Sequence, residues 1–318
     1  MARTTTTTAS CSETTARENI MTLRAHILGA AAGGGLPQWN CGCDNCNLAR
    51  GGKIPSQTQS SLAVTAEGNE WAILNASPDI RQQLAQTACL FPSGPRQLPL
   101  RSVLLTNGDI DHIAGLLTLR EMQPFRLFAT AGIHEVLVQN PIFAALDPSV
   151  VRREAIAMDT PFELVKGLTA TLFAVPGKVP LYMEGDEVQT DLIGDQTVGV
   201  EMSTASGRVF YIPGCAILND ALRARLERAD LVFFDGTLWR DDEMIRAGLG
   251  QKTGKRMGHM SMDGADGSIA AFADLNIGQK VYVHMNNTNP VLRPESTERA
   301  TAQAAGWVIG QDGMEITL

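Results

Sequence analysis

The feature that most constrains the fold of this chain is a short polar loop between an apolar segment and a helical pattern. Residues 102–105 read Ser-Val-Leu-Leu, which is typical of a buried strand, and residues 113–116 read as the start of a helix. The loop between them, residues 106–112, reads Thr-Asn-Gly-Asp-Ile-Asp-His. We therefore predict a tight strand-to-helix loop in which the side chains of Asp111 and His112 converge on one point.

The composition favours a globular protein with a sizeable core. The chain has 318 residues, of which 44% are hydrophobic and 19% are charged, enough for one large domain or two small ones. The net charge of -8 argues against nucleic acid as a main partner. Because no apolar run approaches the ~18 residues that a membrane span needs, we predict no membrane insertion.

The first twenty residues differ in composition from the rest of the chain. Residues 1–20 contain a run of threonines and no apolar segment of the kind that a secretory signal requires. We expect a disordered leader here, with Met21 as an alternative start. A chain without such a signal is expected in the cytoplasm, a reducing compartment in which cysteine clusters bind metal more often than they form disulfides.

Strand-like and helix-like patterns alternate along residues 21–318, and no linker rich in proline, glycine or serine divides them. The sequence therefore predicts a single α/β domain of layered sheets covered by helices. The predicted strands are residues 23–28, 60–65, 71–74, 101–105, 126–129, 162–165, 168–175, 198–203, 209–212, 231–234, 280–283 and a short one near Trp307. The predicted helices are residues 79–88, 132–139, 221–229, 265–274 and 294–305.

Side chains that can bind metal follow several of the predicted buried strands. They comprise two histidines and two carboxylates, namely Asp111, His112, Asp235 and His284. One such residue alone is usually a helix cap or a turn former. Four at matching strand ends predict a shared site, because the loops at the carboxyl ends of parallel strands meet at one edge of a sheet.

A second candidate metal site is the Cys-x-Cys-x-x-Cys segment at Cys41, Cys43 and Cys46. Thiolates at this spacing can share one tetrahedral zinc ion, and closed sites rich in thiolates are structural. A fourth ligand is needed, and no cysteine or histidine lies nearby. Asp44 is one local alternative, and an open fourth position is another. The remaining three cysteines are scattered, and we expect those in the predicted domain to be core or loop residues.

Seven segments together resemble the metallo-β-lactamase superfamily and, within it, the family of pyrroloquinoline quinone (PQQ) biosynthesis B proteins. They are LGAAAGGGLPQWNCGCDNC, NASPDIRQQL, TNGDIDHIAGL, FAVPGKVPLY, FFDGTLW, GHMSM and VHMNNTNP, and they span the chain after Met21. The resemblance implies a four-layer αββα sandwich with a metal site along one edge. Together with the cysteine cluster, it implies a sandwich that carries an N-terminal zinc knuckle.

The chain departs from the superfamily pattern at one of two metal positions. The superfamily loop is His-x-His-x-Asp-His, and Asn107 and Asp109 stand where its first two histidines would be. A third histidine of that position is replaced by Lys178 in Pro-Gly-Lys. Lys178 is expected either to pair with Asp109 or to be a solvated turn residue. The resemblance therefore implies one active-site metal, held by the four strand-end residues.

Two further residues take their expected roles from the resemblance. His259 matches a histidine that serves as a proton donor or substrate contact in related phosphodiesterases and tRNA-processing enzymes. Its alternative role is to order a helix that starts near Asp263. Asn287 stands where related phosphodiesterases have the fourth zinc ligand of the knuckle, and it is the candidate for that role here. The knuckle is then expected to tie the first loop to the loop that carries His284.

The loss of one metal position bears on the chemistry. Hydrolases of this superfamily use two cations ~4 Å apart to generate and aim a hydroxide. One cation with two histidines, one or two carboxylates and open positions instead suits non-haem Fe(II) and O₂. The resemblance implies hydroxylation of the tyrosine ring of a small Glu–Tyr-derived peptide precursor of PQQ. Fe(II) is the expected active-site cofactor, with zinc as the ion bound on purification, structural zinc in the knuckle and O₂ as cosubstrate.

The candidate catalytic residues beside the metal are His259, Asp109 and Lys178. One alternative function is a soluble carrier of PQQ or its precursor, and another is a metal-dependent hydrolase. We expect substrate recognition by Trp39, Trp239 and Arg240 from their places in loops, and a homodimer as the assembly.

Overall fold

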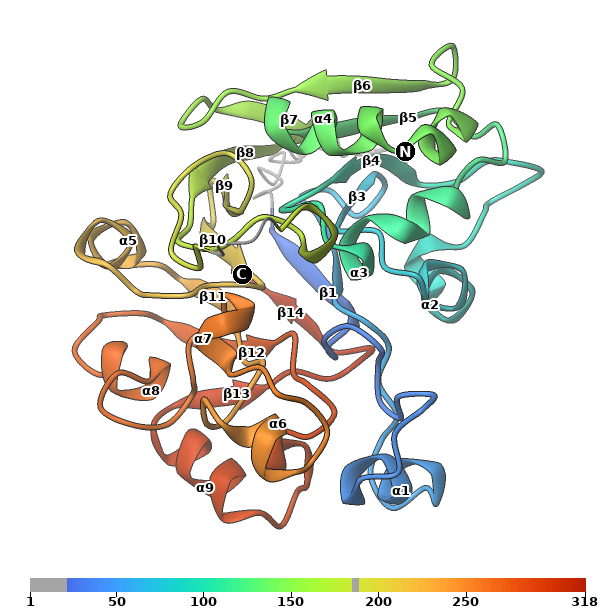
Figure 1. Ribbon diagram of the computed structural model, residues 1–318. Coiled ribbons are helices and arrows are strands. Elements are labelled where there is room, and N and C mark those ends of the chain that lie inside the picture. The colour runs from blue at the N-terminus through green and yellow to red at the C-terminus, as the bar shows by residue number, and fades with distance from the viewer. Residues whose placement is uncertain (1–21, 185–188) are drawn as a thin grey trace, which may run out of the picture.

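The protein forms two seven-stranded sheets that pack face to face between layers of helices (Figure 1). The computed structural model describes residues 22–184 and 189–318. The first sheet has the order β14 (Glu315–Thr317), β1 (Arg24–Gly29), β2 (Ser61–Thr65), β3 (Trp71–Leu74), β4 (Leu100–Leu104), β5 (Phe125–Ala129) and β6 (Val151–Ala155). The second has the order β13 (Trp307–Ile309), β12 (Gln279–Val283), β11 (Leu231–Asp235), β10 (Gly207–Ile212), β9 (Val198–Thr204), β8 (Leu168–Ala174) and β7 (Phe162–Val165).

Helices cover the outer faces of both sheets. In Figure 1, α4 lies beside β5 and β6 of the first sheet, and α9 lies beside β13 of the second. The helices are α1 (Asp44–Arg50), α2 (Ile80–Gln86), α3 (Ile110–Ile113), α4 (Ala131–Gln139), α5 (Asp220–Leu226), α6 (Glu243–Arg246), α7 (Gly254–Met257), α8 (Ser268–Ala271) and α9 (Thr297–Ala304). This arrangement confirms the predicted αββα sandwich.

The central strands are apolar because both of their faces are covered. Every residue of β3, which reads Trp-Ala-Ile-Leu, and of β11, which reads Leu-Val-Phe-Phe-Asp, is buried. Such strands read as continuous apolar runs rather than as alternating patterns. The two sheets also meet through polar groups, since the hydroxyl groups of Ser60 and Tyr211 lie 3.0 Å apart in the buried interface.

An aromatic cluster fixes the end of the second sheet. The rings of Tyr282 and Trp307 stack with centroids 3.8 Å apart, and Phe272 packs edge-on against Trp307. Phe272, Tyr282 and Trp307 are all at most 2% exposed. Burial of these large rings stabilises the register of β12 against β13, where Lys280 pairs with Trp307 in a parallel ladder.

The strand registers bring the strand ends predicted from the sequence to one edge of the sandwich. In the second sheet, β10, β11 and β12 are parallel, and Asp235 at the end of β11 is in register with Val283 at the end of β12. In the first sheet, β3 and β4 are parallel and end level at Leu74 and Leu104. The loops that follow β4, β11 and β12 therefore meet between the two sheets.

Several predicted elements differ from the structure in length. The helix predicted at residues 265–274 is wrong in extent, since α8 has only four residues and the chain then turns. Gly267, the residue before α8, has a φ of -81° and a ψ of 159°, an extended conformation that breaks a continuous helix from residue 265. The helix predicted at residues 294–305 begins later, at Thr297, because the Ser296 side chain caps its first turn.

Two predictions from the sequence concern the extent of the domain. The leader predicted at residues 1–20 lies outside the described residues, and the assignment of residues 21–318 to a single domain remains a prediction. Within the part of the chain that the structure describes, none of the helices has the length and apolar character needed to cross a membrane.

Candidate metal site

The loop after β4 places Asp111 and His112 by means of two buried asparagines. The Asn75 side chain accepts a hydrogen bond of 2.9 Å from the Thr106 backbone amide, which fixes the start of the loop. The Asn107 side-chain oxygen accepts a 3.0 Å hydrogen bond from the Asp109 amide and lies 2.7 Å from Nδ1 of His112. Asn107 therefore orients the His112 ring instead of serving as a ligand.

This orientation leaves the other ring nitrogen of His112 available. When Nδ1 donates its proton to Asn107, Nε2 carries a lone pair, which is the form that binds a metal. Nε2 is buried and has no hydrogen-bond partner among the described residues. Burial, with the nearby imidazoles of His284 and His259, lowers the pKa of His112 to about 4, so that the ring is neutral at neutral pH.

His284 follows β12 with a backbone conformation unusual for its residue type. Its φ is 57°, in the left-handed region, which costs a non-glycine residue about 1–3 kcal/mol and is found where function demands a fixed position. Its Nε2 lies 3.1 Å from Oδ2 of Asp111. Burial alone lowers the pKa of His284, but the carboxylates of Asp111, Asp235 and Asp109 outweigh it and raise the pKa.

Asp111 is an ionised carboxylate beside these imidazoles. Burial raises its pKa, but the neighbouring imidazoles of His112 and His284, the second through a hydrogen bond, hold the pKa well below its usual range. Asp111, His112 and His284 each present a donor atom within 4.8 Å of the other two. Two neutral or readily deprotonated imidazoles and a carboxylate fit a divalent transition metal. The chemistry of the donor set therefore matches the metal that the sequence implies.

Asp235 lies at the end of β11 and is fully buried. Its Oδ2 lies 2.6 Å from Nδ1 of His259 and accepts a 3.0 Å hydrogen bond from the Cys215 amide, and its Oδ1 accepts hydrogen bonds from Thr237. Asp235, His259 and His284 form a second group of donor atoms within 4.8 Å of one another. The two groups share His284, so the structure links all four predicted strand-end residues and adds His259 to them.

The Thr237 hydroxyl lies at the centre of this network. Its oxygen is 2.6 Å from Oδ1 of Asp235, 2.8 Å from Nδ1 of His284 and 3.1 Å from Nδ1 of His259. A hydroxyl has one proton to donate and two lone pairs. It can therefore donate to the Asp235 carboxylate and accept from the Nδ1 atoms of both histidines. Sequence reasoning missed Thr237. Its signal was a polar side chain two residues after Asp235, in the Gly-Thr turn.

We expect Thr237→Val to weaken binding of the active-site metal by about 10–100-fold, the usual effect of removing a group that orients a metal-binding histidine. Competition with a chromophoric chelator measures this affinity. Thr301→Val, on the exposed face of α9, is the control and should leave the affinity unchanged. Equal affinities for the Thr237 variant and the wild type would show that the hydroxyl does not orient His284.

Lys178 does not pair with Asp109, so that prediction is wrong. Its Nζ lies 3.0 Å from Glu184, whose carboxylate also accepts hydrogen bonds of 2.9 and 3.3 Å from the Arg256 guanidinium. The Lys178 and Glu184 side chains are only 12% and 7% exposed. Glu184 is the better partner because two cations hold it ionised, whereas burial and Asp111 raise the pKa of Asp109.

The Glu184 ion pairs predict a dependence of stability on pH. The guanidinium of Arg256, followed by the ammonium of Lys178, lowers the pKa of Glu184 from 4.5 to about 2. A depressed carboxyl pKa stabilises the folded state above the unfolded-state value and loses that effect as the pH falls from about 4.5 to about 2. Glu184→Gln should therefore be destabilising at neutral pH, and its deficit should shrink across this window. Urea unfolding at a series of pH values measures the difference, and a deficit independent of pH would contradict it.

A cavity of about 430 Å³ adjoins these residues. Its lining includes the candidate ligands Asp111, His112 and His284, together with His259, Thr237, Asp109 and Lys178. Its other walls are formed by Tyr182, Met244, Lys252 and Met257, among others, none of which was predicted from the sequence. Residues from several separate loops and short helices converge there, and no local sequence pattern marks such a wall.

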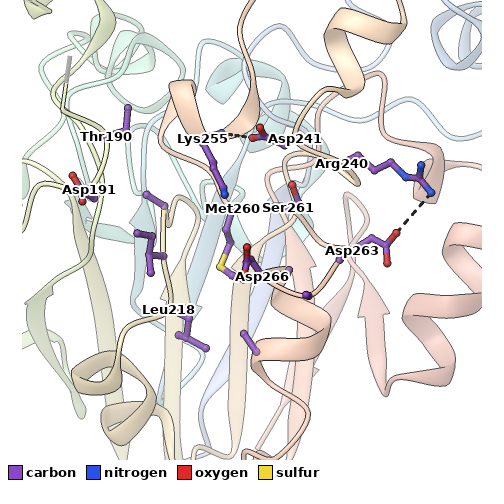
Figure 2. A pocket seen from close by; sticks show the side chains of 16 residues that line it. Thr190, Asp191, Leu218, Arg240, Asp241, Lys255, Met260, Ser261, Asp263 and Asp266 are labelled. Carbon is purple, nitrogen blue, oxygen red and sulfur yellow. Dashed lines mark hydrogen bonds and ion pairs between the residues drawn. The ribbon is translucent and has the colours of Figure 1, made fainter. Parts of the chain in front are cut away.

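The residues predicted to recognise substrate do not line this cavity. Trp39 is 86% exposed and Trp239 is 5% exposed, and neither is part of the wall. Arg240 instead lines a second cavity of about 910 Å³, where it lies 3.9 Å from Asp263 (Figure 2). The segment that contains α7, His259 and Met260 separates the two cavities, because its residues contribute to the linings of both.

The three cysteines of the knuckle converge as predicted. The sulfur atoms of Cys41, Cys43 and Cys46 lie within 4.8 Å of one another. The side-chain amide of Asn287 lies 3.2, 3.5 and 3.3 Å from these sulfurs in the same order. A half-turn of this amide presents its oxygen to a cation at the centre. Asp44 is exposed and does not belong to the group, so Asn287 fits the fourth position better than Asp44 does.

The knuckle is joined to the loop that carries His284. Asn45, in α1, donates hydrogen bonds of 2.9 Å to the backbone oxygens of both Asn287 and Asn289. Burial raises the pKa of the Cys43 thiol to about 11, so a cation is needed to hold three thiolates together at neutral pH. The chemistry of the cluster therefore fits a structural zinc ion that supports one wall of the site.

Comparisons with known proteins agree with this architecture. The β-lactamase superfamily domain model matches residues 70–285. A coenzyme PQQ synthesis protein B from Ruegeria pomeroyi is 60% identical over 292 residues, which cover 92% of this chain and 99% of that protein. One from Rhizobium meliloti is 55% identical over 298 residues, which cover 93% and 98%.

Solved structures of related proteins have a similar fold. The crystal structure of Zn(2+)-bound PqqB from Methylobacterium extorquens superposes with a TM-score of 0.91 at 51% identity and covers 93% of this chain and 100% of that one. A diphosphatase of the PhnP family shares the fold alone, with a TM-score of 0.66 at 19% identity over 94% of this chain and 98% of that one. This chain therefore belongs to the coenzyme PQQ synthesis protein B family of the metallo-β-lactamase superfamily.

Proposed function

We propose that this protein acts in PQQ biosynthesis as a mononuclear non-haem iron enzyme that hydroxylates the tyrosine ring of a Glu–Tyr-derived precursor. One observation above all supports the proposal: two side chains that stand where the superfamily has ligands for a second metal are engaged with other groups. Asn107 is bound to the His112 ring, and Lys178 is held in an ion pair with Glu184. Neither side chain is available as a ligand for a second cation.

This arrangement disfavours hydrolysis by the two-cation route. Hydrolases of the superfamily hold their second cation ~4 Å from the first. Here, an ammonium and an amide stand where two of its ligands would be, and an ammonium has no lone pair with which to bind a cation. Asp111, His112 and His284 remain as two imidazoles and one carboxylate, the donor set of non-haem Fe(II) oxygenases. Asp235, which shares a second group of donor atoms with His284, is a further candidate carboxylate ligand.

Different side chains of this chain orient the metal ligands, contact the substrate ring and transfer a proton. Iron, when bound, supplies the activation of O₂. Asn107 and Thr237 orient the imidazoles, and Met244 and Met257 offer an apolar wall for an aromatic ring. The Asp235 carboxylate holds Nδ1 of His259 at 2.6 Å, so the other ring nitrogen of His259 is the group suited to accept or return a phenolic proton of the substrate.

The reaction replaces a ring C–H bond by C–OH. One oxygen atom of O₂ enters the ring and the other leaves as water, so each turnover also consumes two electrons and two protons from an external reductant. We place this reaction in the cytoplasm, where reducing conditions keep the zinc-binding thiols free of disulfides. A homodimer remains a prediction.

Anaerobic reconstitution with Fe(II), followed by the Glu–Tyr-derived precursor, ascorbate and O₂, tests the proposal. We expect a product heavier than the precursor by one oxygen atom, formed with Fe(II) and not with Zn(II). Cleavage of phosphodiester or lactam substrates by the Zn(II) form would support a hydrolase instead. Tight binding of PQQ without any product would support a carrier.

A further inference from the structure

Two lysines line the cavity beside the candidate metal ligands, and they differ in their surroundings. Lys178 is neutralised by Glu184 at 3.0 Å. Lys252 is half-buried in the cavity wall and makes no ion pair or hydrogen bond with residues 22–184 or 189–318. Charged groups that are partly removed from water are normally paired, because desolvation of a lone charge is unfavourable. Lys252 thus presents a positive charge to the cavity that no described side chain neutralises.

The backbone around Lys252 is held in place. The next residue, Thr253, caps α7, and its hydroxyl accepts a hydrogen bond from the Arg256 amide. The Gly254 amide donates to the backbone oxygen of Asp241 at 2.9 Å, and the Lys255 amide donates to the Asp241 side chain at 2.7 Å. The lysine therefore projects from a fixed anchor at the start of α7.

The same wall offers contacts for an aromatic ring. Met244 in α6 and Met257 in α7 lie in the cavity lining with Lys252, and thioether side chains make favourable contacts with aromatic rings. Tyr182 also lines the cavity, and its hydroxyl donates a 2.6 Å hydrogen bond to the Gly108 backbone oxygen, which fixes its ring. A ligand with a ring and a carboxylate matches this combination of an apolar wall and one cation that has no partner among the described side chains.

We propose that Lys252 is a specificity residue that binds a carboxylate of an aromatic amino-acid substrate and so turns its ring toward the metal ligands. This inference deepens the proposed function and rests on it for the nature of the substrate. A carboxylate is preferred to a cationic group at this position because Lys252 is positively charged. Asp111, on another part of the lining, is an acidic side chain and disfavours a carboxylate there.

The test compares two ligands and two lysine variants by calorimetry on the Zn(II)-loaded protein, which is independent of oxygen chemistry. The first ligand is the Glu–Tyr-derived precursor. The second is the same compound with the carboxylate of its tyrosine-derived part converted to a methyl ester. The variants are Lys252→Gln and, as the matched control, Lys255→Gln. Lys255 lies three residues away in the same segment but lines the second cavity, beside Asp241 (Figure 2).

We expect Lys252→Gln to weaken binding of the free acid by roughly tenfold to a hundredfold, the cost of losing a charged hydrogen bond. The methyl ester should bind the wild type and this variant alike, and Lys255→Gln should bind both ligands as the wild type does. Equal affinity of the free acid for wild type and Lys252→Gln would overturn the inference and leave the proposed function standing. If the free acid did not bind the wild type at all, the proposed substrate class and this inference would both fail.

Discussion

His284→Ala should abolish product formation and weaken the active-site metal by at least about a hundredfold. His284 is the one residue common to both groups of donor atoms, with Asp111 and His112 on one side and Asp235 and His259 on the other. Removal of its ring therefore leaves each group with two donors. Metal content after dialysis and product yield under single-turnover conditions measure the two effects.

His134→Ala is the control for this variant. His134 lies in α4, and its ring nitrogen contacts the Glu154 backbone oxygen, far from the candidate ligands in the chain. It should retain both metal and product formation. Stoichiometric metal and unchanged turnover in His284→Ala would show that the active-site metal is held elsewhere.

Cys46→Ala should lower the zinc content by one ion per chain and loosen the knuckle. Cys46 is fully buried, and its sulfur is one of three that surround the Asn287 amide. Two thiolates and one amide are too few donors for a closed structural zinc site. Once the ion is lost, the two remaining thiolates repel each other until they are protonated. Because Cys46 lies in α1, the loss of the ion also frees this helix, and α1 should become sensitive to limited proteolysis.

Cys89→Ala provides the comparison, because Cys89 is a half-buried free cysteine outside the cluster. It should keep its full zinc content and its resistance to protease. The Cys46 variant should also show a modest loss of activity, since Asn45 ties α1 to the loop that follows His284. Full zinc content in Cys46→Ala would contradict the assignment of the knuckle as a zinc site.

The strand ends could be predicted from the sequence because buried parallel strands leave a plain signal. The apolar runs before Asp235 and His284 are β11 and β12, and their parallel register follows from strand and helix alternation. β6 and β14 were missed because they are edge strands. β6 reads Val-Arg-Arg-Glu-Ala, and its stability comes from its ladder with β5 and from ion pairs such as Arg126 with Glu154 rather than from an apolar pattern.

The partners of individual side chains could not be predicted in the same way. Lys178 pairs with Glu184 rather than with Asp109 because Arg256, distant in the sequence, holds Glu184 in place. Arg240 follows Trp239 in a loop near the site, but the chain directs it into the other cavity. Such choices depend on the tertiary arrangement of several loops, and a local pattern does not encode them.

Isotope labelling of the product tests the central claim most directly. The Fe(II)-loaded protein is given the Glu–Tyr-derived precursor and ascorbate under ¹⁸O₂ in ordinary water, and the reverse labelling is run in parallel. One-metal oxygen chemistry predicts a product whose new ring oxygen is ¹⁸O from the gas and not from the water. A product that takes its new oxygen from water, or a cleaved product that carries water oxygen, would contradict the account.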